Sequence, residues 1–194
     1  MANFKICCNT LAMTVLLVCL LLLGGCAAPP VRQMGAAVPP DTFQLQGRIG
    51  VRYGTQGFSG NFNWRHGAQD DEILLLSPLG QAVARIVRDP TGVQLDTSDG
   101  HHAAQDAAEL TQRILGWRLP LDGMQYWVTG QQAPDGAANI THDAAMNVIR
   151  LRQQQWEIEY PEYRAEGAYV LPSRVVMRNG TLELKLVVDK WTLP

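Results

Sequence analysis

Two successive stretches of the chain, between Phe43 and Arg65, alternate apolar and polar residues one by one, and no other feature limits the possible folds so strongly. Successive side chains of a β-strand point to opposite faces, so this alternation predicts two strands, each with one apolar and one solvated face. Glycines at 54 and 57 mark the turn between them. Near the other end, Asn179-Gly180 separates runs at 173–178 and 181–190 and predicts a hairpin, because both residues tolerate positive φ.

Strand patterns also occur between these two hairpins. An unbroken apolar run at 73–76 is typical of a covered strand, and Asp89-Pro90-Thr91-Gly92 separates strands expected at 82–88 and 93–95. Asp70-Asp71-Glu72 is interpreted as a solvated hairpin loop. Five strands in a row joined by short turns predict an antiparallel meander. Later strands are expected at 139–143, 148–151 and 156–160, with a polar loop at 161–167.

The pattern becomes helical in mid-chain. Residues 103–115 are good helix formers with one apolar stripe, and Gly116 is a plausible end. A second, shorter helix is expected from Pro120 to Gly130. Both helices are lopsided, so each needs an apolar surface to lie on. The sequence therefore predicts one domain, mainly β with α, in which a strongly curved antiparallel sheet wraps around two helices.

The N-terminal residues indicate export. An apolar run from about Leu11 to Leu23 follows the single charge of Lys5 and ends in Leu23-Gly24-Gly25-Cys26, which resembles the bacterial lipobox. An ordinary signal peptide or a transmembrane anchor is the alternative, but the run is short and interrupted for a span. We expect a cleaved lipoprotein signal peptide at 1–25, a lipidated Pro/Ala-rich tether at 26–41 with the lipid on Cys26, and a folded domain at 42–194.

Composition excludes several classes of function. The chain has 16 Lys and Arg against 18 Asp and Glu, with no basic cluster for nucleic acid. Three of the four cysteines lie in the signal and the fourth is Cys26, so we expect no disulfide in the domain. His101 and His102 are adjacent and lack a surrounding ligand pattern, so we expect no metal site. No catalytic motif is found, and we expect neither enzyme activity nor a cofactor.

The segment Ser77-Pro78-Leu79-Gly80 places a leucine in a turn between two apolar strands. Either Leu79 folds back onto the core, or it is exposed at the tip. If it is exposed, it forgoes the ~1.5–3 kcal/mol available from burial, and a partner surface should use it.

Taken together, the chain resembles the LolB family, outer-membrane receptors that take lipoproteins from the periplasmic carrier LolA and insert them. The resemblance runs from about Phe43 to Trp191. The pieces that carry it are Gly47-Arg48-Ile49, Phe62-Asn63-Trp64, Leu74-Leu75-Leu76-Ser77-Pro78-Leu79-Gly80, Leu119-Pro120-Leu121, Trp127-Val128-Thr129-Gly130, Gln155-Trp156-Glu157-Ile158-Glu159-Tyr160, Leu171-Pro172 and Lys185-Leu186-Val187-Val188-Asp189-Lys190-Trp191.

The resemblance implies an unclosed antiparallel β-barrel whose helices form an inner lid over an apolar cavity for acyl chains. It implies that the loop of Pro78, Leu79 and Gly80 inserts into the membrane, and that the partners are LolA, the acyl chains of cargo lipoproteins and outer-membrane lipid. We expect a monomer on the periplasmic face of the outer membrane, anchored through Cys26. Each aromatic residue among the candidates has a competing role in the core, which we favour for any single one of them. The candidate cavity lining is Phe62, Trp64, Leu110, Ile114, Met124, Trp127, Trp156, Ile158, Leu184 and Leu186.

Two other functions remain open. A lipoprotein that carries free lipid would have the same cavity without a preference for lipidated protein. A structural outer-membrane lipoprotein would have a filled core and no cavity.

Overall fold

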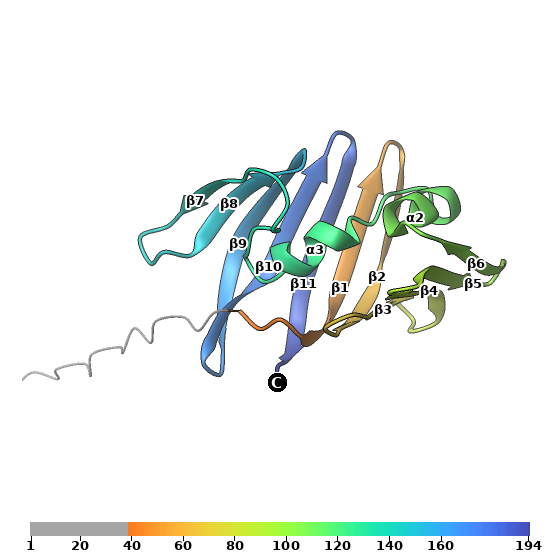
Figure 1. The fold of residues 1–194 in the computed structure, drawn as a ribbon, viewed down its shortest axis with the longest axis horizontal. Helices are drawn as coiled ribbons and strands as arrows, with labels where there is room; N and C mark the ends of the chain where they lie inside the picture. The colour runs from red at the N-terminus through yellow and green to blue at the C-terminus, as the bar shows by residue number, and fades with distance from the viewer. Residues whose placement is uncertain (1–38) are drawn as a thin grey trace, which may run out of the picture. The chain divides into compact units, whose positions relative to one another are not determined.

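The computed structural model describes residues 39–194, which form one antiparallel sheet and two helices (Figure 1). The strands and helices, in chain order, are β1 (Phe43–Tyr53), β2 (Gln56–His66), β3 (Asp71–Leu76), β4 (Ala82–Asp89), β5 (Gly92–Thr97), β6 (Gly100–Ala104), α2 (Ala107–Leu115), α3 (Leu121–Trp127), β7 (Asn139–His142), β8 (Val148–Gln153), β9 (Trp156–Glu166), β10 (Tyr169–Asn179) and β11 (Leu182–Thr192).

The eleven strands follow the order β6-β5-β4-β3-β2-β1-β11-β10-β9-β8-β7. Two meanders, β1 to β6 and β7 to β11, are joined where β1 pairs with β11 over Gln44 to Tyr53. Within residues 39–194, β6 and β7 are the two edges and do not pair with each other, so the sheet is not closed. The predicted meander and the Asn179-Gly180 hairpin are confirmed.

One face of the sheet is apolar because the strands alternate as predicted. In β1, Phe43, Leu45 and Ile49 are buried, whereas Gln44 and Gln46 are exposed. Nearly all buried hydrophobic residues of the described unit form one cluster, drawn from strands β1 to β5 and β8 to β11 and from both helices, and Ala104 of β6 and Ile140 of β7 pack against it partly buried. This unit therefore has its own core.

Both helices lie on this apolar face (Figure 1). The chain leaves the sheet at β6, on one edge, and re-enters at β7, on the other, so α2 and α3 have to cross the face between them. Asp106 caps α2, since its side chain accepts a hydrogen bond from the Glu109 amide, and Gly116 ends it with a φ of 84°, which favours glycine. The buried side chains of α3 are Leu121, Met124 and Trp127, together with Gly123.

Three local predictions were wrong. The helix expected from residue 103 begins at Ala107, because Ala103 and Ala104 pair with β5 in the additional strand β6. The loop expected at 161–167 is mostly strand, since β9 continues past Pro161 to Glu166. Pro161 is tolerated because the β9–β10 register shifts opposite it, where a missing amide hydrogen bond costs little. The third error concerns Asp71, which is 1% exposed rather than solvated.

The predicted signal peptide (1–25) and nearly all of the tether (26–41), including Cys26, lie outside the described residues. In the part that the structure describes, no helix combines the length and apolar character that a membrane span needs.

Candidate functional site

The β3–β4 connection presents Leu79 to solvent. The Ser77 amide donates to Gln81 O at 2.8 Å and the Gly80 amide to Ser77 O at 2.9 Å, which closes a three-residue loop of Pro78, Leu79 and Gly80. Gly80 has a φ of 84°, the left-handed conformation that this loop requires. The Leu79 side chain is 89% exposed. Of the two alternatives for this leucine, the structure shows the exposed one, held on a short, hydrogen-bonded tip.

The ten candidate lining residues come together in the apolar cluster beneath the helices. Nine of them are buried, and Ile114 packs against the cluster. The rings of Trp127, from α3, and Trp156, from β9, have centroids 5.9 Å apart. These side chains pack against one another in a single hydrophobic cluster. A cavity beneath the helices stays a prediction.

Asp71 and Arg88 fasten α3 to the sheet. Asp71 Oδ1 accepts from Trp64 Nε1 and lies by His66 Nδ1, each at 2.7 Å, while Oδ2 accepts from Arg88 Nε at 2.9 Å. Arg88 also forms an ion pair with Asp122 of α3. Burial pushes the pKa of Asp71 up, but the hydrogen bond with His66, the charge of Arg88 and the Trp64 hydrogen bond outweigh it, and the pKa lies below its ordinary value.

A second fastening of α3 uses the buried side chain of Gln153 in β8. Its Oε1 accepts from Trp127 Nε1 at 3.0 Å and from the Ala133 amide at 2.8 Å. Its Nε2 donates to the carbonyls of Ala133, Asp135 and Gly136. This one amide therefore joins α3, the segment that follows it and the sheet.

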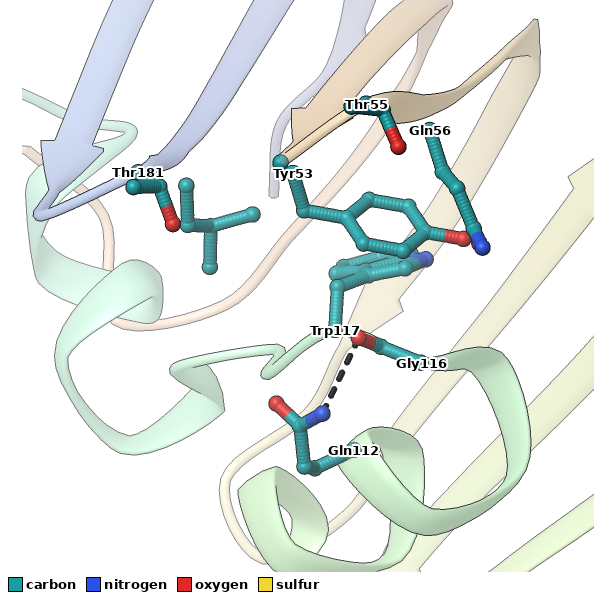
Figure 2. A pocket seen from close by; sticks show the side chains of 9 residues that line it. Tyr53, Thr55, Gln56, Gln112, Gly116, Trp117 and Thr181 are labelled. Carbon is teal, nitrogen blue, oxygen red and sulfur yellow. Dashed lines mark hydrogen bonds between the residues drawn. The ribbon is translucent and has the colours of Figure 1, made fainter.

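The attachment of α2 at its C-terminal end is slighter. Tyr53 Oη donates to Leu115 O at 3.3 Å, and the Tyr53 ring lies against Gly116. Beside this contact a pocket of about 500 Å³ opens between the β1–β2 turn, the β10–β11 turn and the end of α2 (Figure 2). Its lining is Tyr53, Gly54, Thr55, Gln56, Gln112, Gly116, Trp117, Thr181 and Leu182. Trp117 is nearly buried, so the floor of the pocket is continuous with the apolar cluster.

Sequence reasoning found the Leu79 loop and the apolar residues but missed both polar fastenings. Asp71 was grouped with its charged neighbours, although it continues the alternation of Ile73 and Leu75 and so faces inward. His101 Nδ1 contacts the Asp96 carboxylate at the solvent-exposed end of the sheet. Among residues 39–194, no group of three His, Cys, Asp or Glu side chains is arranged to hold a metal ion.

Comparison with known proteins decides the family. The family model described as "Outer membrane lipoprotein LolB" matches residues 41–191. The chain belongs to the LolB family. An outer-membrane lipoprotein LolB of Nitrosomonas europaea is 40% identical over 187 residues, covering 89% of this chain and 88% of the relative. The LolB of Thiobacillus denitrificans is 40% identical over 175 residues, covering 87% and 91%. LolB membership places the chain among outer-membrane lipoproteins of lipoprotein localisation.

Solved structures agree on the fold of this LolB chain. A LolA superfamily protein from Nitrosomonas europaea aligns with a TM-score of 0.51 at 10% identity, covering 83% of this chain and 90% of that protein. A DUF1329 family protein from Desulfovibrio piger aligns with a TM-score of 0.53 at 5% identity, covering 79% and 86%. At these identities the likeness concerns the fold alone. The predicted family and the open antiparallel sheet with two helices are confirmed.

Proposed function

We propose that this LolB chain is an outer-membrane receptor that accepts lipoproteins from the periplasmic carrier LolA by binding their acyl chains, and then inserts them into the outer membrane. The observation that carries the proposal is the cover on the apolar face. Within residues 39–194, the apolar side of the unclosed sheet is covered by two short helices, of nine and seven residues. Moving them would uncover a continuous apolar surface.

Burying an acyl chain on the apolar face yields more free energy than exposing the side chains of a covering helix costs. Exposing three large side chains of α3, Leu121, Met124 and Trp127, costs roughly 5–9 kcal/mol at ~1.5–3 kcal/mol each. One fatty chain of about sixteen carbons gains roughly 12 kcal/mol at ~0.8 kcal/mol per methylene. A single chain can therefore replace the contacts of a helix. Handover needs neither nucleotide nor cofactor if affinity for the chains rises from carrier to receptor to bilayer.

Opening starts at the pocket shown in Figure 2. α3 is fastened to the sheet by Arg88 and by Gln153, whereas the end of α2 is held by the 3.3 Å hydrogen bond between Tyr53 and Leu115. The end of α2 therefore moves more easily than α3. Lifting the end of α2 uncovers Trp117, which belongs to the apolar cluster.

The membrane side of the function rests on Cys26 and Leu79. Acyl groups on Cys26 anchor the receptor to the periplasmic face of the outer membrane, and the tether at 26–41 lets one monomeric domain reach up to ~45 Å from the bilayer at roughly 3 Å per residue. Leu79, 89% exposed between Pro78 and Gly80, enters the membrane or steers the chains into it.

The test of the receptor function is transfer from the carrier. The chain from residue 27 onward, which lacks the lipid anchor and keeps the whole described unit, is mixed with a lipoprotein bound to LolA. A receptor strips the cargo from the carrier. A carrier of free lipid binds acyl chains but leaves the cargo on LolA, and a structural lipoprotein binds neither. Either of the last two results contradicts the proposal.

The role of Leu79 has a separate test. Leu79→Glu should leave transfer from the carrier intact and stop delivery to liposomes, because a charge at the tip cannot enter the apolar layer. Met146→Glu is the matched control: Met146 is also at a hairpin tip and is 74% exposed, and its substitution should leave delivery unchanged. Equal delivery by both variants would remove the assigned role.

A further inference from the structure

Most buried polar side chains on the inner face of the sheet are hydrogen-bonded, but three are not. Trp64 donates to Asp71, Trp127 to Gln153, and Tyr163 Oη to Val148 O at 2.7 Å. Within residues 39–194, the buried polar side-chain atoms without a partner are Tyr160 Oη, Ser173 Oγ and Trp191 Nε1. The three residues are 3%, 6% and 6% exposed. Native proteins keep few such groups, because a buried donor without an acceptor costs free energy.

Two of the three atoms belong to one stretch of the sheet, whereas the third is set apart: Arg174 pairs with Val187, so Trp191 lies three residues beyond the level of Ser173 and packs against Phe43 of β1. Tyr160 is in β9, Ser173 in β10 and Trp191 in β11, and these strands are adjacent in the sheet. Tyr160 follows the buried Trp156 and Ile158 in alternation, and Ser173 lies between the buried Leu171 and Val175. Tyr160 and Ser173 both lie where the β9–β10 register shifts, between the pairs Pro172–Tyr163 and Val176–Glu159.

Packing alone does not explain these residue types. Phenylalanine would fill the place of Tyr160 without a buried hydroxyl, and alanine would do so for Ser173. The burial that surrounds Tyr160 also raises the pKa of its hydroxyl well above the ordinary value, so it stays a neutral donor. On one stretch of this apolar surface, a tyrosine hydroxyl and a serine hydroxyl from adjacent strands offer two neutral donors.

The chemistry of these donors selects the ligand. Neither hydroxyl is charged, and the charged residue that is buried in the described unit, Asp71, is already bound by Arg88, His66 and Trp64. A phosphate or carboxylate would find no countercharge here. A neutral carbonyl oxygen attached to hydrocarbon fits both the donors and the apolar surroundings.

We propose that Tyr160 and Ser173 form a polar subsite on the inner face that binds the ester carbonyl oxygens of an acylated glycerol while its hydrocarbon chains occupy the apolar cluster. This inference rests on the proposed acyl-chain binding and adds a preference. The receptor recognises the linkage between chain and glycerol as well as the chain itself. In the absence of lipid, these two donors lack partners, which costs the folded state free energy.

The experiment compares two lipids that differ only in the carbonyl groups, dioctanoylglycerol and its dioctyl ether analogue. Binding to the chain from residue 27 onward is measured by displacement of an apolar fluorescent dye. We expect the diester to bind about tenfold more tightly than the diether, since each hydrogen bond in an apolar site changes affinity by about two- to tenfold. Tyr160→Phe and Ser173→Ala should each reduce this ester preference by about threefold and leave diether binding unchanged.

Tyr163→Phe is the matched control, because the Tyr163 hydroxyl already donates to Val148 O. This variant should lower the urea midpoint of unfolding and leave the ester preference intact. Tyr160→Phe should keep the midpoint or raise it, since it loses no hydrogen bond. Equal binding of diester and diether by the unmodified chain overturns the subsite but leaves acyl-chain binding in place. Binding of neither lipid contradicts the proposed function itself, and a loss of stability in Tyr160→Phe shows that its hydroxyl has a structural role.

Discussion

Replacing Asp71 by asparagine tests how the cover is held to the sheet. Asp71→Asn keeps the shape of the side chain and removes the negative charge. That charge pairs with Arg88 and strengthens the hydrogen bonds of the carboxylate with His66 and Trp64. Removing one partner of a buried ion pair costs ~3–5 kcal/mol, and asparagine retains one oxygen that can accept a hydrogen bond, so we expect a loss of about 3 kcal/mol. For a domain of this size that lowers Tm by roughly 6–12 °C.

The measurement is urea unfolding followed by tryptophan fluorescence, with Glu72→Gln as the control. Glu72 is the next residue in β3, and its ion pairs with Arg85 and Arg65 are exposed to solvent. Exposed pairs contribute ~0–1 kcal/mol, so this variant should be close to the unmodified chain. Hydrogen exchange gives a second readout. Because Arg88 would no longer be held in place for Asp122, the amides of α3 should exchange faster in Asp71→Asn.

The acid limb of the stability curve should change as well. The pKa of Asp71 is lower in the folded chain than in the unfolded one, so the folded chain holds this proton less tightly. Its contribution to stability is complete above the ordinary carboxyl pKa of about 4 and disappears as the pH falls through the lower folded pKa. Asp71→Asn should therefore lose less stability on acidification. If it is no less stable than Glu72→Gln, or shows the same acid limb as the unmodified chain, the assigned role of Asp71 is wrong.

Three further changes probe other contacts. Gln153→Leu should cost about 3 kcal/mol in urea unfolding, because the Trp127 indole and the amide and carbonyls of the following segment lose their partner in a buried place. Gly123→Ala should cost about 2 kcal/mol, since its Cβ would lie 2.3 Å from the Trp127 ring, whereas Gly50→Ala, with only Lys185 Cβ at 4.0 Å, should be close to neutral in the same assay. Met146→Asn should raise the free energy of unfolding by about 0.5–1 kcal/mol, and Tm slightly with it. Met146 has a φ of 65°, which asparagine adopts more readily than methionine.

The sequence predicted what depends on local periodicity. The alternations of β1, β2 and β11 specify which side chains are buried, and the hairpin at Asn179-Gly180 fixes the pairing of β10 with β11. Propensity was misleading at Ala103 and Ala104, which are good helix formers but complete a strand on the edge of the sheet. The helix starts only where Asp106 can cap it.

What could not be predicted depends on contacts between distant segments. Arg88 meets Asp122 across thirty-four positions of the chain, and Gln153 meets Trp127 across twenty-six. Neither pair has a local signature, because each depends on where the helices lie on the sheet. The Leu79 loop was different, since proline and glycine around it determine a short turn whatever the rest of the chain does.

The pairing of the first strand with the last one sets the order in which the domain can be assembled. A ribosome or a translocation channel delivers β1 before β11, and within residues 39–194 the hydrogen bonds between these two strands join the two halves of the sheet. Until Leu182 to Thr192 has emerged, each half has an exposed apolar face and an edge strand whose backbone hydrogen-bonding groups are unpaired. The two meanders can therefore pair only after β11 is available, and a truncation that removes β11 would leave them unpaired within one chain that is prone to aggregate.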